Sequence, residues 1–260
     1  MRSEPQRVKV LADRPIALTI AGFDPSSGAG ATADLQVFAD HGVSGVIALT
    51  ALTVQSTQQV LRVEPVSPSL LRETLACLTG DRPIAGVKIG MLATAQGVET
   101  VTDFLRSASI PRDRIVLDPV IRSTSGAVLL EPEGVRRVSG TLFKQVGWVT
   151  PNLEELGSLL GEPTPGRAAI PAMAARLAQL GAPGLNVIVT GGHLTPPDDF
   201  LRTADGQEQW FPGSRIAAAS THGTGCAFSS ALLCRLLLGD DPAKAVAAAK
   251  AYVRARLERS

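Results

Sequence analysis

The sequence predicts one α/β domain whose central sheet is mostly parallel. Short apolar runs rich in β-branched residues alternate along the chain with longer segments of helical periodicity. The 260 residues are 45% hydrophobic, which is enough to bury a large core, and no repeat or long linker divides them. Alternating strands and helices build a parallel sheet with helices on both faces, so we expect a three-layer α/β/α sandwich.

The expected elements follow this pattern in order. The polar residues 1–14 have no periodicity and are expected to form a flexible tail, which leaves 15–260 as the domain. Short apolar runs predict strands at 16–21, 45–52, 60–66, 86–89, 114–117, 147–149 and 185–189. Helical periodicity covers 31–41, 69–79, 95–107, 132–145, 152–160, 168–180, 225–238 and 242–258. The pattern Glu208-Gln-Trp-Phe-Pro-Gly-Ser-Arg-Ile216 indicates a hairpin at 208–217, and hence an antiparallel sheet edge.

The composition argues against several classes of partner. Lysine and arginine number 25 against 24 aspartate and glutamate, so no overall field favours nucleic acid or an acidic membrane. No run approaches the roughly 18 apolar residues of a membrane helix, and residues 16–21 are too few for a signal peptide. The cysteines, Cys77, Cys226 and Cys234, are odd in number and sparse, which indicates a reducing compartment. We therefore expect a cytoplasmic protein that recognises a small molecule.

A glycine-rich turn follows the first predicted strand, at the sheet edge where α/β proteins bind ligands. It reads Ala21-Gly-Phe-Asp-Pro-Ser-Ser-Gly-Ala-Gly30 and leads into a helix. A dinucleotide fingerprint starting at Gly28 would need that glycine next to the strand and an acid about 20 residues later. Six residues separate Ala21 from Gly28, and the region near Thr50 has no acid, so this reading is disfavoured. No Gly-x-x-x-x-Gly-Lys-Ser/Thr motif occurs, which excludes a P-loop.

A second turn, Thr221-His-Gly-Thr-Gly-Cys226, precedes a long apolar helical pattern. Small residues at a helix start expose backbone N–H groups, and the helix dipole adds partial positive charge, so this turn is a predicted anion site. A cysteine at such a position has its thiolate favoured. An isolated cysteine is more often a buried apolar residue, but the glycine context here favours a functional Cys226.

A series of short motifs occurs in a fixed order along most of the chain. They are Ala-Leu-Thr-Ile-Ala-Gly-x-Asp-Pro-Ser at 17–26, Gly-Ala-Gly-x-x-Ala-Asp-Leu at 28–35, Thr-Ala-Leu-Thr-x-Gln at 50–55, Val-Lys-Ile-Gly-Met-Leu at 87–92, Leu-Asp-Pro-Val at 117–120, Thr-Pro-Asn-Leu-x-Glu at 150–155, Gly-Gly-His at 191–193 and the turn at 221–226. Each motif alone is weak evidence. In this order, the chain resembles the hydroxymethylpyrimidine/phosphomethylpyrimidine kinases of the ribokinase-like superfamily.

The resemblance implies a ribokinase-like fold and a homodimeric kinase of thiamine biosynthesis. Its activity would transfer phosphate from ATP, with Mg²⁺, to 4-amino-5-hydroxymethyl-2-methylpyrimidine and then to the monophosphate. The resemblance assigns the pyrimidine to Gly22, Asp34, Thr53, Gln55, Met91 and Val120. A carboxylate and a carboxamide suit the amino and ring nitrogens of an aminopyrimidine. Without the resemblance, Asp34 would be read as a solvated helix acid and Gln55 as a strand-end cap.

The resemblance also assigns residues to the nucleotide, the metal and the transferred group. Residues expected at ATP are Asn152, Thr190, Gly192 and Lys250, and those expected at the metal are Asp118 and Glu155. Hard oxygen ligands suit magnesium, although Asn152-x-x-Glu155 alone would more often be a helix cap. The turn of Gly223, Thr224 and Gly225 would hold the phosphoryl group. Cys226, which stands where most of the superfamily has aspartate, would accept the hydroxyl proton.

Three positions depart from the family pattern. Thr190 stands where relatives usually have lysine, and Ser26-Ser27 replaces a Gly-Gly pair. The segment Arg122-Ser-Thr-Ser-Gly126 replaces a Val-Ala-Lys-Ser-Gly flap, so a second lysine is lost at Thr124. Because these two lysines are missing, the protein could also be a sensor that binds the pyrimidine without phosphorylating it. A pyridoxine or pyridoxal kinase is also open, because its substrate has nearly the same shape.

Overall fold

A computed structural model of the protein describes residues 14–56, 58–216 and 222–259. The expected N-terminal tail therefore lies outside the described residues, except for Arg14. Thr221, the first residue of the expected anion turn, also lies outside them.

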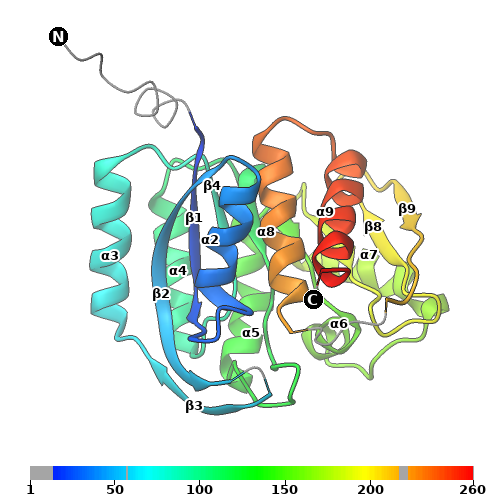
Figure 1. Ribbon diagram of the computed structural model, residues 1–260, viewed down its shortest axis with the longest axis horizontal. Helices are drawn as coiled ribbons and strands as arrows, with labels where there is room; N and C mark the ends of the chain where they lie inside the picture. Colours follow the sequence, from blue (N-terminus) through cyan, green and yellow to red (C-terminus); the bar gives the residue numbers. More distant parts are fainter. Residues whose placement is uncertain (1–13, 57, 217–221, 260) are drawn as a thin grey trace.

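The described residues form one nine-stranded sheet in the order β3-β2-β1-β4-β5-β6-β7-β8-β9 (Figure 1). Its parallel strands are β1 (Ile16–Phe23), β2 (Ser44–Gln55), β4 (Gly86–Ile89), β5 (Ile115–Leu117), β6 (Trp148–Val149) and β7 (Asn186–Val189). Antiparallel strands complete both edges: β3 (Val60–Pro65) on one side, and β8 (Asp199–Arg202) with β9 (Glu208–Phe211) on the other. The predicted fold class is confirmed.

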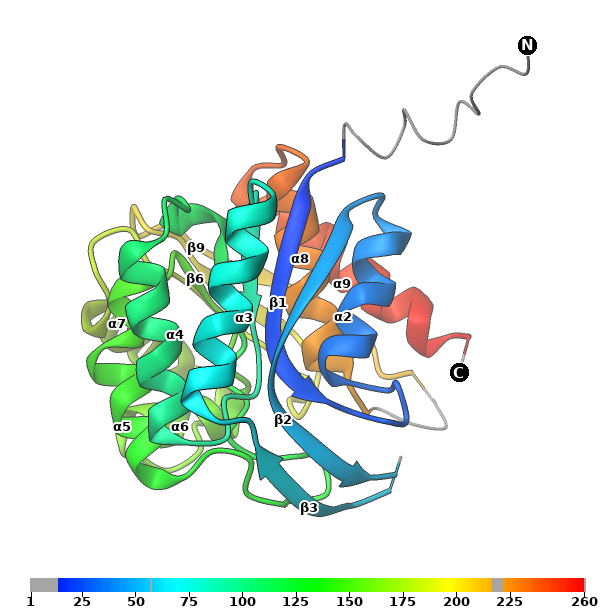
Figure 2. The same cartoon turned by 90° about the vertical axis from the view of Figure 1, so that its left-hand side faces the viewer.

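Helices cover both faces of the sheet, as Figures 1 and 2 show. One face carries α2 (Gly30–Asp40), α8 (Thr224–Leu237) and α9 (Pro242–Leu257). The other carries α3 (Pro68–Asp81), α4 (Ala95–Ser107), α5 (Pro132–Gly140), α6 (Leu153–Leu160) and α7 (Ile170–Leu180). Each face has its own apolar core, with Phe38 and Leu232 buried in one and Phe143 and Leu177 in the other. Among the described helices, none is long and apolar enough to cross a membrane.

Local sequence signals fix the first turns of several helices. The Ser67 side chain accepts a hydrogen bond from the backbone N–H of Leu70 at the start of α3. Asp241 does the same for Lys244 at the start of α9, and a proline follows each of these caps. Side-chain acceptors at these positions satisfy N–H groups that the helix itself leaves unpaired, so they define where the helix begins.

Two expectations for the second half of the chain were wrong in position. Strand β9 lies in the expected hairpin at 208–217, but its partner β8 precedes it in the chain. Strand β8 escaped prediction because Asp199 and Arg202 flank only two apolar residues. The helix expected at 132–145 ends at Gly140, because Thr141 leaves the helical region with φ −127°, and a 3₁₀ turn follows at Leu142–Gln145.

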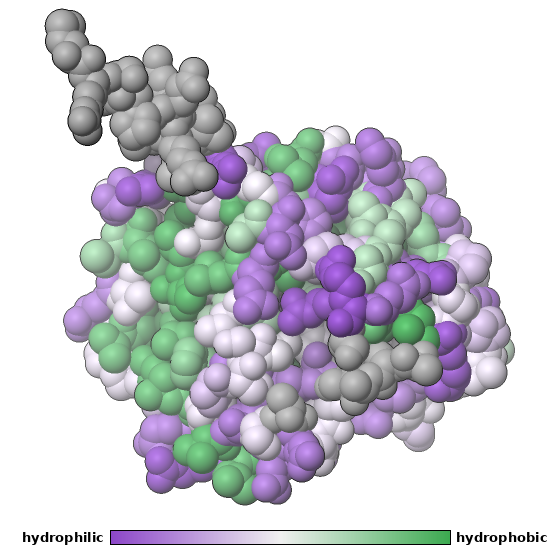
Figure 3. Space-filling view, viewed as in Figure 1, coloured by the Kyte–Doolittle hydropathy of each residue, from purple (hydrophilic) through white to green (hydrophobic). Residues whose placement is uncertain are grey.

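The hairpin of β2 and β3 projects from the body of the molecule (Figure 2). Because side chains alternate along a strand, Thr53 and Gln55 lie on one face of β2 while Leu52 and Val54 lie on the other. The latter two are 49% and 46% exposed, and Leu61 of β3 is 68% exposed. Figure 3 shows hydrophobic side chains gathered on the side of the molecule where β2 and α3 lie.

Candidate active site

A cavity of about 910 Å³ lies where the carboxyl ends of the parallel strands meet. Each exit contributes at least one lining residue: Asp24 after β1, Gln55 at the end of β2, Met91 after β4, Asp118 after β5, Asn152 after β6 and Thr190 after β7. This is the expected ligand edge of an open α/β sheet. A volume near the upper end of the range for small-molecule pockets is large enough for two ligands side by side.

The turn between β1 and α2 is organised by Asp24, which is 3% exposed. Its carboxylate accepts hydrogen bonds from the backbone N–H of Ser26 at 2.8 Å, the hydroxyl of Ser26 at 2.7 Å and the backbone N–H of Ala29 at 2.9 Å. His222 Nε2 lies 2.9 Å from the same carboxylate. Burial opposes ionisation, but the hydrogen bonds from His222, Ser26 and Ala29 outweigh it, so the pKa of Asp24 is lowered. An ionised Asp24 thus ties the first turn to the start of α8.

Most of the residues expected at the pyrimidine line one end of the cavity. They are Gly22, Thr53, Gln55, Met91 and Val120. The Thr53 hydroxyl donates to the carbonyl oxygen of Phe23 at 2.9 Å, which fixes the rim of the pocket. A side chain at Gly22 would press on the Met91 sulfur, because an added Cβ would lie 2.9 Å from it. Small size at residue 22 therefore keeps this end open.

Asp34 does not line this cavity, which corrects its expected contact with the pyrimidine. Its side chain is fully buried, and both carboxylate oxygens lie 3.0–3.1 Å from Nζ of Lys88. Hydroxyl groups of Thr19 and Ser230 donate to the same carboxylate at 2.6 and 2.7 Å. Because protein groups donate to both of its carboxylate oxygens, Asp34 contributes to the core and not to the lining of the pocket. The acid that does line this end of the cavity is Asp24.

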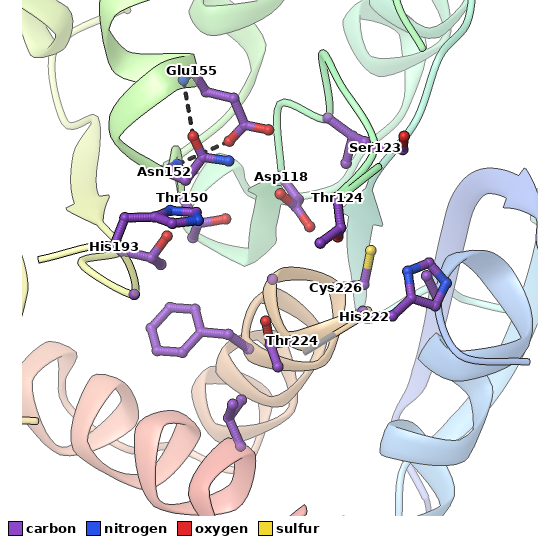
Figure 4. Close-up of a pocket in the computed structure, with 18 of the residues that line it drawn as sticks. Asp118, Ser123, Thr124, Thr150, Asn152, Glu155, His193, His222, Thr224 and Cys226 are labelled. Carbon is purple, nitrogen blue, oxygen red and sulfur yellow. Dashed lines mark hydrogen bonds between the residues drawn. The ribbon is translucent and has the colours of Figure 1, made fainter. Parts of the chain in front are cut away.

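The predicted anion turn has the expected backbone form. Helix α8 begins at Thr224, and the preceding Gly223 adopts φ +76°, which only glycine tolerates easily. An added Cβ at Gly223 would overlap the carbonyl oxygen of Gly28, so the two glycine-rich turns are in direct contact. Gly223, Thr224, Gly225 and Cys226 all line the cavity. Figure 4 shows Thr224, Cys226 and Asp118 around one common space.

Cys226 lies where the starts of α2 and α8 converge. The backbone N–H of Gly30 favours the thiolate form of Cys226, and the carboxylate of Asp118 is another neighbour that affects its pKa. Burial raises the pKa of Cys226 to about 12; Lys88 opposes this rise, whereas the carboxylates of Asp118 and Asp34 add to it. The expectation of a thiol with a lowered pKa is therefore wrong. Desolvation and two nearby carboxylates outweigh the helix dipole.

Two buried carboxylates, Asp118 and Glu155, face the middle of the cavity. Burial raises the pKa of each; the charge of Asp118 further raises that of Glu155, while Lys88 opposes the rise at Asp118. Glu155 also accepts from the backbone N–H of Asn152 at 2.9 Å, and the Asn152 side chain accepts from Glu155 N–H at 3.0 Å (Figure 4). Asn152 and Glu155 thus form a capping box at the start of α6, as the motif alone would suggest.

The carboxylate pair fits a hard cation, because a positive charge between the two groups would relieve their mutual repulsion. Within the described residues, no group of three or more His, Cys, Asp or Glu side chains could hold a metal ion. A cation here would need further oxygen ligands from water or from a bound phosphate, as is usual for magnesium.

The other end of the cavity carries the residues expected at the nucleotide. Thr190, Gly192 and Lys250 line it together with His193. Thr190 forms a parallel bridge with Asn152, so the exits of β6 and β7 are joined. Nζ of Lys250 lies 2.6 Å from the carboxylate of Asp199 and donates to the carbonyl oxygen of Pro197 at 3.2 Å. Lys250 therefore stands at the pocket wall with a fixed side chain.

Sequence reasoning gave no role to Lys88, Asp24 or His222, although each lies within a motif that carries the resemblance. For Lys88 the sequence did contain a signal, because it lies between apolar residues in the strand segment Val87-Lys-Ile89. A lysine buried in such a strand needs a partner of opposite charge. Its partner could not be named, since Asp34 is 54 residues away in the sequence. The contact between Asp24 and His222 spans 198 residues and had no sequence signal.

Comparisons with known proteins agree with this geometry. The profile of the phosphomethylpyrimidine kinase family matches residues 24–260. The chain is 40% identical over 246 residues to a hydroxymethylpyrimidine/phosphomethylpyrimidine kinase of Aquifex aeolicus, covering 94% of this chain and 95% of that protein. It is 39% identical over 236 residues to a thiamine biosynthesis multifunctional protein of Corynebacterium efficiens, covering 90% of this chain and 31% of that one. The solved pyridoxal kinase of Staphylococcus aureus, in complex with AMP-PCP and pyridoxal, superposes with a TM-score of 0.83 and 26% identity, covering 94% of this chain and 88% of that one.

Proposed function

The chain belongs to the phosphomethylpyrimidine kinase family, and from this premise we propose how its pocket carries out the reaction. The enzyme phosphorylates 4-amino-5-hydroxymethyl-2-methylpyrimidine and then its monophosphate, which yields the diphosphate used in thiamine biosynthesis. The observation that carries the site proposal is the convergence of a glycine-rich helix start, Cys226 and two buried carboxylates at the centre of one cavity.

ATP is the proposed phosphate donor. A structural relative was solved with the ATP analogue AMP-PCP, and it shares the fold over 94% of this chain. In the present chain, Thr190, Gly192 and Lys250 would contact the nucleotide, and Asn152 would hold the wall beside it. The transferred phosphoryl group would lie at the backbone N–H groups of Gly223, Thr224 and Gly225, where the dipole of α8 favours negative charge.

The pyrimidine would occupy the opposite end of the cavity. The carboxamide of Gln55 can pair with the ring nitrogen and the amino group, and Met91 and Val120 would pack on the ring faces. This orientation would direct the hydroxymethyl group toward Cys226 and the anion turn. Holding the two reactants in this geometry is a large part of catalysis in phosphoryl transfer.

Cys226 is the proposed acceptor of the hydroxyl proton. Because the raised pKa of its thiol favours the protonated form, Cys226 must first give up its own proton to act as a base. The positive charge of Lys88 favours the loss of that proton, because it lowers the pKa of the thiol. Magnesium, held by Asp118 and Glu155 with phosphate oxygens, would neutralise charge on the phosphates.

We also propose that the protein is a homodimer in the cytoplasm. The exposed face of the β2–β3 hairpin combines Leu52 and Val54 with Arg62 and Glu64, which pair with Val54 and Leu52 across the strands. A two-fold axis could place Arg62 of one subunit against Glu64 of the other. All three cysteines are free thiols, which supports a reducing compartment.

A direct assay tests the function against its alternatives. The purified protein should convert the hydroxymethylpyrimidine with Mg·ATP to the monophosphate and then the diphosphate, followed by mass spectrometry, with a higher kcat/KM than for pyridoxal or pyridoxine. The variant Cys226→Ala, purified in the same way, is expected to be about 10²- to 10⁴-fold slower. Activity of this variant equal to that of the wild type would indicate a contaminating kinase or a reaction that does not need Cys226. A preference for pyridoxal would establish the alternative kinase, and ligand binding without phosphate transfer would identify a sensor.

A further inference from the structure

Four elements meet at the carboxylate of Asp34, beneath the floor of the cavity. Thr19 comes from β1, Lys88 from β4 and Ser230 from α8, while Asp34 itself lies on α2. All four side chains are fully buried. The ammonium of Lys88 is therefore held at a fixed place relative to the two helix starts that form the glycine-rich turns.

Stability alone is a weak reason for an ion pair at this depth. Removing two charges from water costs free energy, and well-packed apolar residues in place of a buried pair are often as stable or more so. The pair of Lys88 and Asp34 has no exposed surface at which water could lower this cost. A function for the charge itself would explain why the pair is kept at this depth.

Lys88 is placed to serve such a function because it faces the reacting groups. It lines the cavity together with Asp118 and Cys226, and it interacts electrostatically with both. Two other cations that line the cavity are exposed to solvent: Arg122, and Arg254, which forms an ion pair with Glu258. Of the lysine and arginine side chains in the described part of the chain, only Lys88 is fully buried. Solvent screening of its charge is therefore the weakest.

We propose that Lys88, fixed by Asp34, is a positioning residue for phosphoryl transfer that holds Asp118 and Cys226 at the cavity floor and supplies a buried positive charge beneath the anion turn. The inference rests on the proposed function, because it assigns the charge to the transfer step. A fixed charge aimed at negative charge that develops in the transition state lowers the barrier without strengthening ground-state binding. Loss of the Lys88 charge should therefore lower kcat and leave both KM values nearly unchanged.

The test must remove the charge without leaving its partner unpaired. Lys88→Met alone would bury an isolated Asp34 carboxylate, so the informative variant is the neutral pair Lys88→Met/Asp34→Asn. Thr19 and Ser230 donate to different oxygens of Asp34, so the Asp34→Asn carboxamide can accept from one hydroxyl through its oxygen and donate to the other through its amide N–H. We expect kcat to fall about 100-fold while KM for ATP and for the pyrimidine stays within about threefold.

Ser230→Ala is the matched control, because it removes one hydrogen bond from the cluster and keeps both charges. It should lower the melting temperature and leave kcat within about threefold of wild type. A comparable fall of kcat in Ser230→Ala would mean that packing of the cluster, and not charge, matters, which would overturn the proposal.

The remaining outcomes are also decisive. A folded neutral pair with wild-type kcat, or one that raises KM at constant kcat, would refute the role of Lys88 while the active wild type upholds the kinase function. If neither this pair nor Lys88→Gln/Asp34→Asn folds, the charges are a requirement of the fold and the proposal fails. A wild-type protein without phosphate transfer would refute the proposed function, and this inference with it.

Discussion

At the scale of single residues, burial affects the pKa of the Cys226 thiol more than the dipole of α8 does. Its raised pKa, about 12, means that the neutral thiol predominates at every pH below that value. The fraction of thiolate, which is the reactive form, should then be about a thousandfold lower at pH 8 than for a thiol of pKa 9, and should rise about tenfold per pH unit.

We therefore predict slow alkylation of Cys226 by iodoacetamide near pH 7 and a steady increase of the rate up to at least pH 10. Mass spectrometry of the Cys77→Ser variant measures this without interference from the exposed thiol of Cys77. A rate that levels off near pH 8 would show that the pKa of Cys226 lies below 8, contrary to the effect expected from its burial.

Individual contacts are the part of the site that sequence reasoning reaches least well. Gly22, Thr53, Gln55, Met91 and Val120 were expected at one pocket and line it together, although their contacts with a ligand stay a prediction. Asp34 was misplaced because a helix acid can face a pocket or the core, and only the position of Lys88 decides between the two. Such partners are distant in sequence, so no spacing rule identifies them.

At the scale of elements, the start of α8 depends on Gly223 for two separable reasons. Its positive φ strains any residue with a Cβ, and its position against the Gly28 carbonyl oxygen leaves no room for one. Gly239, just after α8, has a similar φ of +90° but open space around an added Cβ. Comparing substitutions at the two glycines therefore distinguishes the effect of backbone strain from that of steric overlap.

Gly239→Ala should cost about 1 kcal/mol of unfolding free energy from strain alone. Gly223→Ala should cost at least about 2 kcal/mol more, because the glycine-rich turns must separate, and should also lower kcat. Urea unfolding of both variants, with steady-state kinetics, measures the difference. If both variants lose the same unfolding free energy, the two glycine-rich turns can move apart without destabilising the protein.

Long helices with a regular pattern and short strands made of continuous apolar residues were predictable, but strand β8 was not. Helices α4 and α7 have the periodicity that the sequence shows, whereas β8 has four residues with charges at both ends. The hydrogen bonds that make β8 a strand come from β7 and β9, so its existence depends on tertiary pairing. Strand β6 has only two residues, but both are apolar and lie within the strand predicted at 147–149.

At the scale of the whole molecule, the order of strands and helices places the carboxyl ends of the parallel strands at one edge, which made the location of the pocket predictable. Among the described residues, β3 ends the sheet with no strand on its outer side, and apolar side chains of the β2–β3 hairpin are exposed there. Natural sheets usually cover or charge such an edge. Contact with a second subunit would cover this one.

The last prediction follows from that edge. Leu52→Asp/Val54→Asp places two carboxylates on the exposed face of β2, where each side chain is about half exposed in the subunit. Surface substitutions of this kind change subunit stability by only about 0.5 kcal/mol, but like charges facing each other across a two-fold interface oppose association. Sedimentation velocity should show a dimer for the wild type and a monomer for the variant. Leu238→Asp is the matched control, because Leu238 is 48% exposed and follows α8, away from the hairpin. A wild-type monomer, or a variant that stays dimeric, would show that the β2–β3 face is not the interface.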